Sequence, residues 1–90
     1  MKIHLYATLR LAAGRSAIET TVGEPRDLIG VLSEIAQPLG QKFQTTLFDG
    51  EESLSPEVVV CLNERMLERG ERVTVSDSDE VSLLMPLAGG

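Results

Sequence analysis

The sequence ends with Glu80-Val81-Ser82-Leu83-Leu84-Met85-Pro86-Leu87-Ala88-Gly89-Gly90. Val81, Leu83 and Met85 recur at every second position, which predicts a strand over 80–85 with these side chains on one face. Beyond Pro86, whose ring fixes φ, the side chains become smaller until the last two residues have none. We therefore expect a strand that continues into an extended tail.

The start of the chain predicts a strand of the same kind. Over residues 2–8, apolar and more polar side chains alternate, which is typical of a half-buried strand. Residues 9–14 break this pattern, and the β-branched stretch 17–22 predicts another strand. The two strands are expected to form an antiparallel hairpin with a long loop between them.

The middle of the sequence predicts one main helix and one shorter helix. Pro25 suits the first position of a helix, and Asp27 would then lie in its first turn. Apolar residues follow at spacings of three and four, as on one helix face: Leu28, Val31, Leu32, Ile35 and Ala36. Pro38 ends this helix, and a shorter helix is expected over 39–48, where apolar residues recur every fourth position.

Three further segments complete the predicted sheet and its connections. Residues 58–62 are apolar on both faces, as in a covered or central strand, and 72–75 form a short edge piece. The acidic stretch 49–57 is expected to be a loop, and Asn63-Glu64 is expected to be a turn that leads into residues 65–67.

This order of elements defines the fold class. The main helix must cross one face of the sheet to connect its neighbouring strands. With the first and last strands adjacent and parallel in the middle, the result is an α+β protein of the ubiquitin-like β-grasp type, with a mixed sheet of four to five strands packed on one main helix. We expect a domain over 1–86, a flexible tail over 87–90, and a second sheet face partly open to a partner.

The composition excludes several classes of function. The formal net charge is −6, and only Lys2 and Lys42 are lysines, so the chain lacks the basic surface that nucleic-acid binding needs. No apolar run approaches the roughly 18 residues of a membrane span, and no apolar leader precedes the first strand. The expected protein is cytoplasmic, without nucleic-acid or membrane partners, and its acidic surface serves solubility or a basic partner.

The sequence lacks the usual catalytic and metal-binding motifs. His4 is the single histidine, and it is expected to face solvent without a nucleophile beside it. Cys61 is the single cysteine, and it is expected to be a small hydrophobic residue of a buried strand. There is no phosphate-binding glycine motif and no cluster at metal-ligand spacing, and 77–80 is expected to be a turn. We therefore expect no bound nucleotide, cofactor or metal.

The Gly89-Gly90 end is the feature that points to chemistry. Glycine adopts backbone angles closed to other residues, and two glycines fit a channel too narrow for side chains. From Leu87 to Gly90 an extended chain reaches roughly 13 Å, enough to place a carboxylate inside the active site of another protein. The alternative is a frayed end that happens to finish in glycine.

Four segments carry a family resemblance: Ile3-His4-Leu5-Tyr6-Ala7-Thr8-Leu9-Arg10, then Asp27-Leu28-Ile29, then Val60-Cys61-Leu62-Asn63, and finally Asp79-Glu80-Val81 with the closing Pro86-Leu87-Ala88-Gly89-Gly90. In this order, and spread over the whole chain, they resemble the MoaD-like and ThiS-like sulfur carriers. These are ubiquitin-like β-grasp proteins, and they include the small subunit of molybdopterin synthase.

The resemblance implies a role for the end of the chain. An E1-like adenylating enzyme would activate the Gly90 carboxylate with ATP, and sulfur transfer would then give a C-terminal thiocarboxylate. The chain would be a non-catalytic subunit that binds the molybdopterin synthase large subunit and donates sulfur to the pterin precursor in molybdenum-cofactor biosynthesis. The tail residues Leu87, Ala88 and Gly89 would thread into the partner.

The resemblance also implies partner contacts outside the tail, by Leu83, Met85, Pro86 and Arg10. Core packing is the alternative role for Leu83, and an ordinary solvated charge is the alternative for Arg10. Three alternative functions stay open: a ubiquitin-like protein modifier conjugated through Gly90, a sulfur carrier for another pathway such as thiamine or a tungsten cofactor, and a plain β-grasp binding module with an idle tail.

Overall fold

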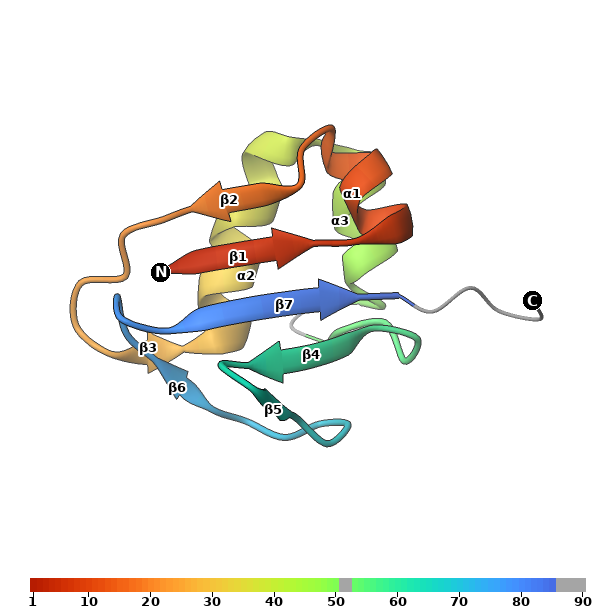
Figure 1. Cartoon of the computed structure of the whole chain (residues 1–90). Coiled ribbons are helices and arrows are strands. Elements are labelled where there is room, and N and C mark those ends of the chain that lie inside the picture. Colours follow the sequence, from red (N-terminus) through yellow and green to blue (C-terminus); the bar gives the residue numbers. More distant parts are fainter. Residues whose placement is uncertain (51–52, 86–90) are drawn as a thin grey trace.

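The computed structural model describes residues 1–50 and 53–85 as a five-stranded sheet with helices packed on it (Figure 1). The strands of the sheet are β1 (Lys2–Leu5), β2 (Ala17–Glu19), β4 (Val59–Leu62), β5 (Arg65–Met66) and β7 (Glu80–Leu84). A two-stranded ribbon is formed by β3 (Arg26–Asp27) and β6 (Thr74–Val75). The helices are α1 (Ala7–Ala13), α2 (Leu28–Ala36), the 3-10 helix η1 (Gln37–Leu39) and α3 (Gln41–Leu47).

The order of strands across the sheet is β2-β1-β7-β4-β5. The central pair, β1 and β7, is parallel, and the other three pairs are antiparallel. The first and last strands of the described chain are therefore neighbours in the middle of the sheet. This confirms the expected mixed sheet and its β-grasp arrangement.

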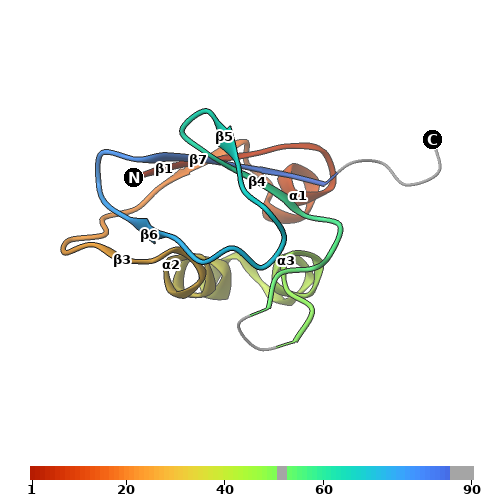
Figure 2. The ribbon, with the colours of Figure 1, turned by 90° about the horizontal axis from the view of Figure 1, so that it is seen from below.

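The core lies between one face of the sheet and the helices (Figure 2). From the sheet it takes alternate residues of the central strands, and from the helices it takes one apolar stripe each, as the periodicity predicts. Its most deeply buried large side chains are those of Phe43, Ile3, Leu5, Leu9, Leu32, Leu47, Leu83, Val75 and Val81.

The prediction for residues 6–14 was wrong. The first strand ends at Leu5 rather than Thr8, and the expected loop is the helix α1. Ala7 has a φ of 50°, so the chain turns sharply there, and Leu9 is then fully buried in the core. Gly14, with a φ of 75°, ends the helix, and its N–H donates to the carbonyl of Arg10 at 2.9 Å.

The start of the main helix also differs from the prediction. Pro25 does not occupy the first helical position, because α2 begins only at Leu28. Asp27 is the N-cap residue rather than part of the first turn, and its side chain makes no capping hydrogen bond. Arg26 and Asp27 instead pair with Val75 and Thr74 in the ribbon of β3 and β6, a long-range contact that local periodicity cannot reveal.

The remaining elements follow the expected order with shifted bounds. Pro38 lies in η1, directly after the main helix, and α3 occupies the middle of the expected 39–48 helix. The turn at Asn63-Glu64 is confirmed: the chain reverses there, Asn63 has a φ of 57°, and the residues that follow form β5, which pairs antiparallel with β4. Among the described residues, no helix is long and apolar enough to cross a membrane.

Candidate functional site

The Gly90 carboxylate, the predicted working group, lies outside the described residues. The same is true of Pro86, Leu87, Ala88 and Gly89. The structure does describe the strand to which these residues are attached and the surface around its end.

The end of β7 is held from both sides. Leu83 lies opposite Leu5 of β1 and Val60 of β4, and Leu84 lies opposite Val59. Strands on both sides fix the position and direction of β7 within the sheet. The point at which the chain leaves the sheet is therefore defined by the fold.

The structure separates the predicted contact residues. Leu83 has no exposed surface and belongs to the core, which was one of its two predicted roles. Met85 is half-buried and packs against the core cluster. Arg10 is exposed on α1. The structure therefore leaves Arg10, and part of Met85, available at the surface near the end of β7.

The second face of the sheet carries His4 and Cys61. No helix covers this face in the described part of the chain (Figure 2). Cys61 lies opposite Met66 on one side and Ser82 on the other, and Ser82 lies opposite His4. Directly opposite residues share a face, so Cys61 points to this open side and is half-buried rather than part of the core.

His4 is close to one carboxylate. Its Nε2 atom is 3.7 Å from Oε2 of Glu80, and the His4 side chain is 28% exposed. No group of three or more histidine, cysteine or acidic residues within 1–50 and 53–85 could hold a metal ion. His4 is thus partly exposed on the face of the sheet opposite the core, which is the face expected from the alternation of residues 2–8.

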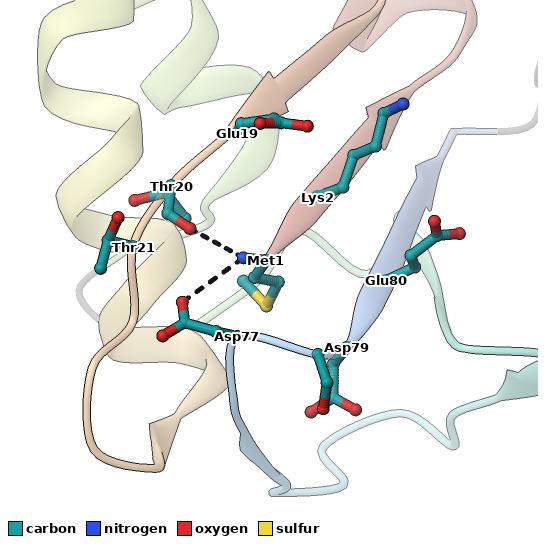
Figure 3. Close-up of a pocket in the computed structure, with 9 residues that line it drawn as sticks. Met1, Lys2, Glu19, Thr20, Thr21, Asp77, Asp79 and Glu80 are labelled. Atoms are coloured by element: carbon teal, nitrogen blue, oxygen red, sulfur yellow. Dashed lines mark hydrogen bonds and ion pairs between the residues drawn. The ribbon is translucent and has the colours of Figure 1, made fainter.

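An acidic recess of about 560 Å³ lies at the opposite end of the sheet, beside the start of β1 (Figure 3). Asp77 organises it: its carboxylate accepts hydrogen bonds from the N–H groups of Val22 at 2.6 Å and Gly23 at 3.1 Å. The α-amino group of Met1 donates to the carbonyl of Thr20 at 2.8 Å and lies 3.5 Å from Oδ1 of Asp77. These contacts join three chain segments, which indicates a structural role.

Both aspartates of the turn before β7 have a lowered pKa. For Asp77 the main cause is the hydrogen bond from the Val22 amide, followed by that from Gly23. For Asp79 the pKa is lowered mainly by the Ser76 amide and then by the side-chain amide of Asn63. Both carboxylates are thus engaged as hydrogen-bond acceptors: Asp77 with the segment that follows β2, and Asp79 with its own turn and with Asn63.

A second recess, of about 610 Å³, lies along β4. Two arginine side chains on its rim contact other parts of the chain. Arg69 donates to the carbonyl of Pro56 at 3.4 Å, and Arg72 lies 3.3 Å from the carboxylate of Asp27. These contacts hold the surrounding loops together.

Two exposed residues were missed as candidates by the sequence analysis. Tyr6 is 46% exposed and Leu11 is 84% exposed. Tyr6 was expected on the polar face of the first strand but was not considered as a contact residue, and Leu11 was placed in the expected loop, where alternation does not predict exposure. The signal that could have revealed them is the run of helix-forming residues up to Gly14, a typical helix end.

Comparison with known proteins gave a family match and several similar structures. Residues 3–90 match the ThiS family. The solution structure of small archaeal modifier protein 1 from Methanosarcina acetivorans is 30% identical, with 99% of this chain and 94% of that chain covered and a TM-score of 0.75. A search of curated proteins gave no significant match.

Two more distant structures share the fold. SAMP1 from Haloferax volcanii is 22% identical, covering 100% of this chain and 98% of that one, with a TM-score of 0.78. Urm1 from Sulfolobus solfataricus is 17% identical, covering 96% of this chain and 100% of that one, with a TM-score of 0.69. At these identities the similarity shows the ubiquitin-like β-grasp fold and nothing more specific.

Proposed function

Because this chain belongs to the ThiS family, we propose that it is a sulfur carrier that works through the carboxylate of Gly90. Members of this family are small ubiquitin-like carriers that generally work with E1-like activating enzymes and are generally not catalysts themselves. The observation that carries the proposal is the family match over residues 3–90, which includes the closing pair of glycines.

The proposed chemistry has two steps. A Gly90 carboxylate oxygen attacks the α-phosphorus of ATP in the activating enzyme, which forms an acyl adenylate and releases pyrophosphate. A sulfide equivalent then attacks the acyl carbon, and AMP leaves with the bonding electron pair. Activation is needed because a carboxylate is a poor acyl donor until one oxygen becomes part of a good leaving group. ATP is a substrate of the partner, and the carrier needs no cofactor of its own.

The proposed role of the tail is to bring the acyl group to each enzyme. Leu87, Ala88 and Gly89 thread into the active site while the domain stays outside. Because the sulfur is then attached to a docked protein, its effective concentration at the acceptor is high.

The proposed acceptor is the pterin precursor of the molybdenum cofactor. In this proposal the chain is the small subunit of a cytoplasmic molybdopterin synthase and binds its large subunit. The support is the resemblance in the four segments that extend from Ile3 to Gly90. A test is co-purification from the native cell: a large synthase subunit supports this acceptor, and a thiamine or tungsten-cofactor enzyme in its place contradicts it.

Mass spectrometry tests the carrier function directly. The protein is incubated with the activating enzyme, ATP and a sulfur donor, and its intact mass is measured. We expect a gain equal to the exchange of one oxygen for sulfur at Gly90. An unchanged mass, with adenylation demonstrated in the same mixture, would contradict the carrier function.

A protein modifier is the second candidate function. The observation that favours it is the 30% identity to a protein named as a small archaeal modifier. Both functions begin with the same adenylate, so the product distinguishes them. Peptides in which Gly90 is joined to a lysine Nζ of another protein would support the modifier function.

The variant Gly89→Val tests the threading of the tail. We expect a folded protein that is no longer adenylated, because the branched side chain would not fit a channel shaped for glycine. Pyrophosphate release measures the reaction. Ala88→Gly, which makes the tail slimmer, is the matched control and should be adenylated normally. Normal adenylation of Gly89→Val would contradict threading through a narrow channel.

A further inference from the structure

Helix α1 has an exposed face that the core does not use. Its one fully buried residue is Leu9, while Ala12 and Ala13 are partly buried against the core. Arg10 and Leu11 are exposed, and Leu11 is the most exposed large apolar residue of the described chain, at 84%. The helix therefore presents an isobutyl side chain and a guanidinium to solvent.

This helix lies at the end of the sheet from which the tail departs. Strands β1 and β7 are parallel, and Leu5 lies opposite Leu83. The Tyr6 N–H, immediately before α1, donates to the carbonyl of Leu83 at 3.3 Å. Figure 1 shows α1 beside the end of β7. The beginning of α1 and the end of β7 are thus adjacent in space.

Exposed apolar residues gather at this end of the molecule. The described residues contain three exposed large apolar side chains: Tyr6, Leu11 and Met66. Single exposed leucines are common on protein surfaces and need no explanation. Here, however, two of the three lie in α1 or at its N-cap, and the half-buried Met85 directly follows β7 at the same end of the sheet.

We propose that the outer face of α1, centred on Leu11 with Arg10 beside it, is a docking surface for the activating enzyme. This inference rests on the proposed function. Five residues follow Met85, and fully extended they reach roughly 17 Å. When Gly90 is in the adenylation site, the surface around the end of β7 must lie within that distance of the site, so α1 faces the enzyme.

The activating enzyme is the expected occupant because every version of the proposed function needs it. A sulfur carrier and a protein modifier deliver Gly90 to different acceptors, but both are first adenylated. The complementary surface on the enzyme is an apolar depression for Leu11 with a carboxylate for Arg10. Such a pair combines burial of an apolar side chain with a charge-assisted hydrogen bond.

The variant Leu11→Ala tests this surface. Alanine is the best helix former, and Leu11 contributes almost nothing to the core, so the variant should fold normally. In ATP–pyrophosphate exchange with this protein as the varied substrate, we expect KM to rise roughly fivefold to thirtyfold while kcat is unchanged. Met66→Ala is the control: Met66 is 66% exposed but lies on the edge strand β5, which β4 separates from β7, and the KM of this variant should stay at the wild-type value.

The outcomes separate the two proposals. If the wild-type protein is not adenylated at all, the proposed function fails, and the docking surface fails with it. If the wild type is adenylated and Leu11→Ala has the wild-type KM, only the docking surface is overturned. A defect of Leu11→Ala that appears solely in the later transfer of the acyl group or sulfur also overturns it, because the surface would then belong to an acceptor protein.

Discussion

At the scale of single residues, Asp77 shows how one carboxylate can hold a small domain together. It accepts hydrogen bonds from the amides of Val22 and Gly23, which follow β2, although it precedes β7 in the sequence. Its pKa is lowered, chiefly by these two amides. The unfolded chain therefore binds more protons than the folded one between the two pKa values of Asp77, so stability falls as the pH falls there.

The variant Asp77→Asn tests this linkage. The wild type should lose stability as the pH is lowered from about 4, the ordinary pKa of an aspartate, through the lower folded value. The variant should be less stable at pH 7 and should show a weaker dependence on pH below about 4. Urea unfolding at a series of pH values measures both. Glu24→Gln, an exposed neighbour of the same loop, is the control, and equal pH dependence in the Asp77→Asn variant and the wild type would contradict the linkage.

Gly30 supplies a second prediction at this scale. It lies inside α2, where glycine is less favourable than alanine by about 1 kcal/mol. A Cβ atom here would meet only the Arg26 guanidinium, at 3.8 Å, so no close approach to the sheet requires glycine. We expect Gly30→Ala to stabilise the protein by about 0.5–1 kcal/mol in chemical denaturation.

Gly14 provides the matched control for Gly30. The space around it is also open, but its φ is 75°, so alanine there is strained. Gly14→Ala should destabilise the protein by about 1 kcal/mol. A gain in stability from both substitutions would show that backbone conformation is not what distinguishes the two glycines.

At the scale of elements, α1 shows why part of the fold could not be predicted. A helix of seven residues is too short to be stable alone, and only Leu9 anchors it fully in the core. One buried residue produces no helical periodicity, and the alternation of residues 2–8 continues into the start of the helix. The long apolar stripe of α2, by contrast, predicted that helix correctly. The helix begins later in the sequence than expected, because Arg26 and Asp27 form β3 and pair with β6.

The variant Leu9→Ala tests how α1 is held. Leu9 is fully buried, so its truncation should cost about 2.7–5 kcal/mol, the range for large-to-small changes in a core. Leu11→Ala, two residues later on the same helix but 84% exposed, should change stability by less than about 0.5 kcal/mol. Urea unfolding of both variants measures the difference. Similar effects in the two would mean that Leu9 does not anchor the helix.

At the scale of the whole molecule, the two ends of the domain meet in the centre of the sheet. Strand β1 begins at Lys2 and pairs over its length with β7, which begins at Glu80. The alternation of both segments was visible in the sequence, and their pairing followed from the order of elements. Which side chains of β4 face the core could not be predicted from the sequence. A strand that is apolar on both faces shows no alternation from which the buried face can be identified. This is why Cys61 was assigned to the interior.

Only part of the candidate site could be predicted from the sequence. The closing glycines could be recognised because their chemistry depends on backbone and carboxylate rather than on packing. Of the surface around the end of β7, the resemblance named Arg10 and Met85, but the exposed face of α1 with Leu11 was missed because the helix itself was not expected. The roles of residues 86–90 stay predictions.

The last prediction concerns the division into a domain over 1–86 and a tail over 87–90. If the tail serves only delivery, a variant that ends at Pro86 should unfold within about 0.5 kcal/mol of the full chain, yet it should not be adenylated. Leu83→Ala, a single truncation inside β7, should instead cost several kcal/mol, about 2–5, because Leu83 is fully buried between β1 and β4. Urea unfolding gives the stabilities, and pyrophosphate release gives the activity. A large loss of stability on removing residues 87–90 would mean that the tail packs against the domain, and a tail held in that way could not deliver Gly90 to another active site.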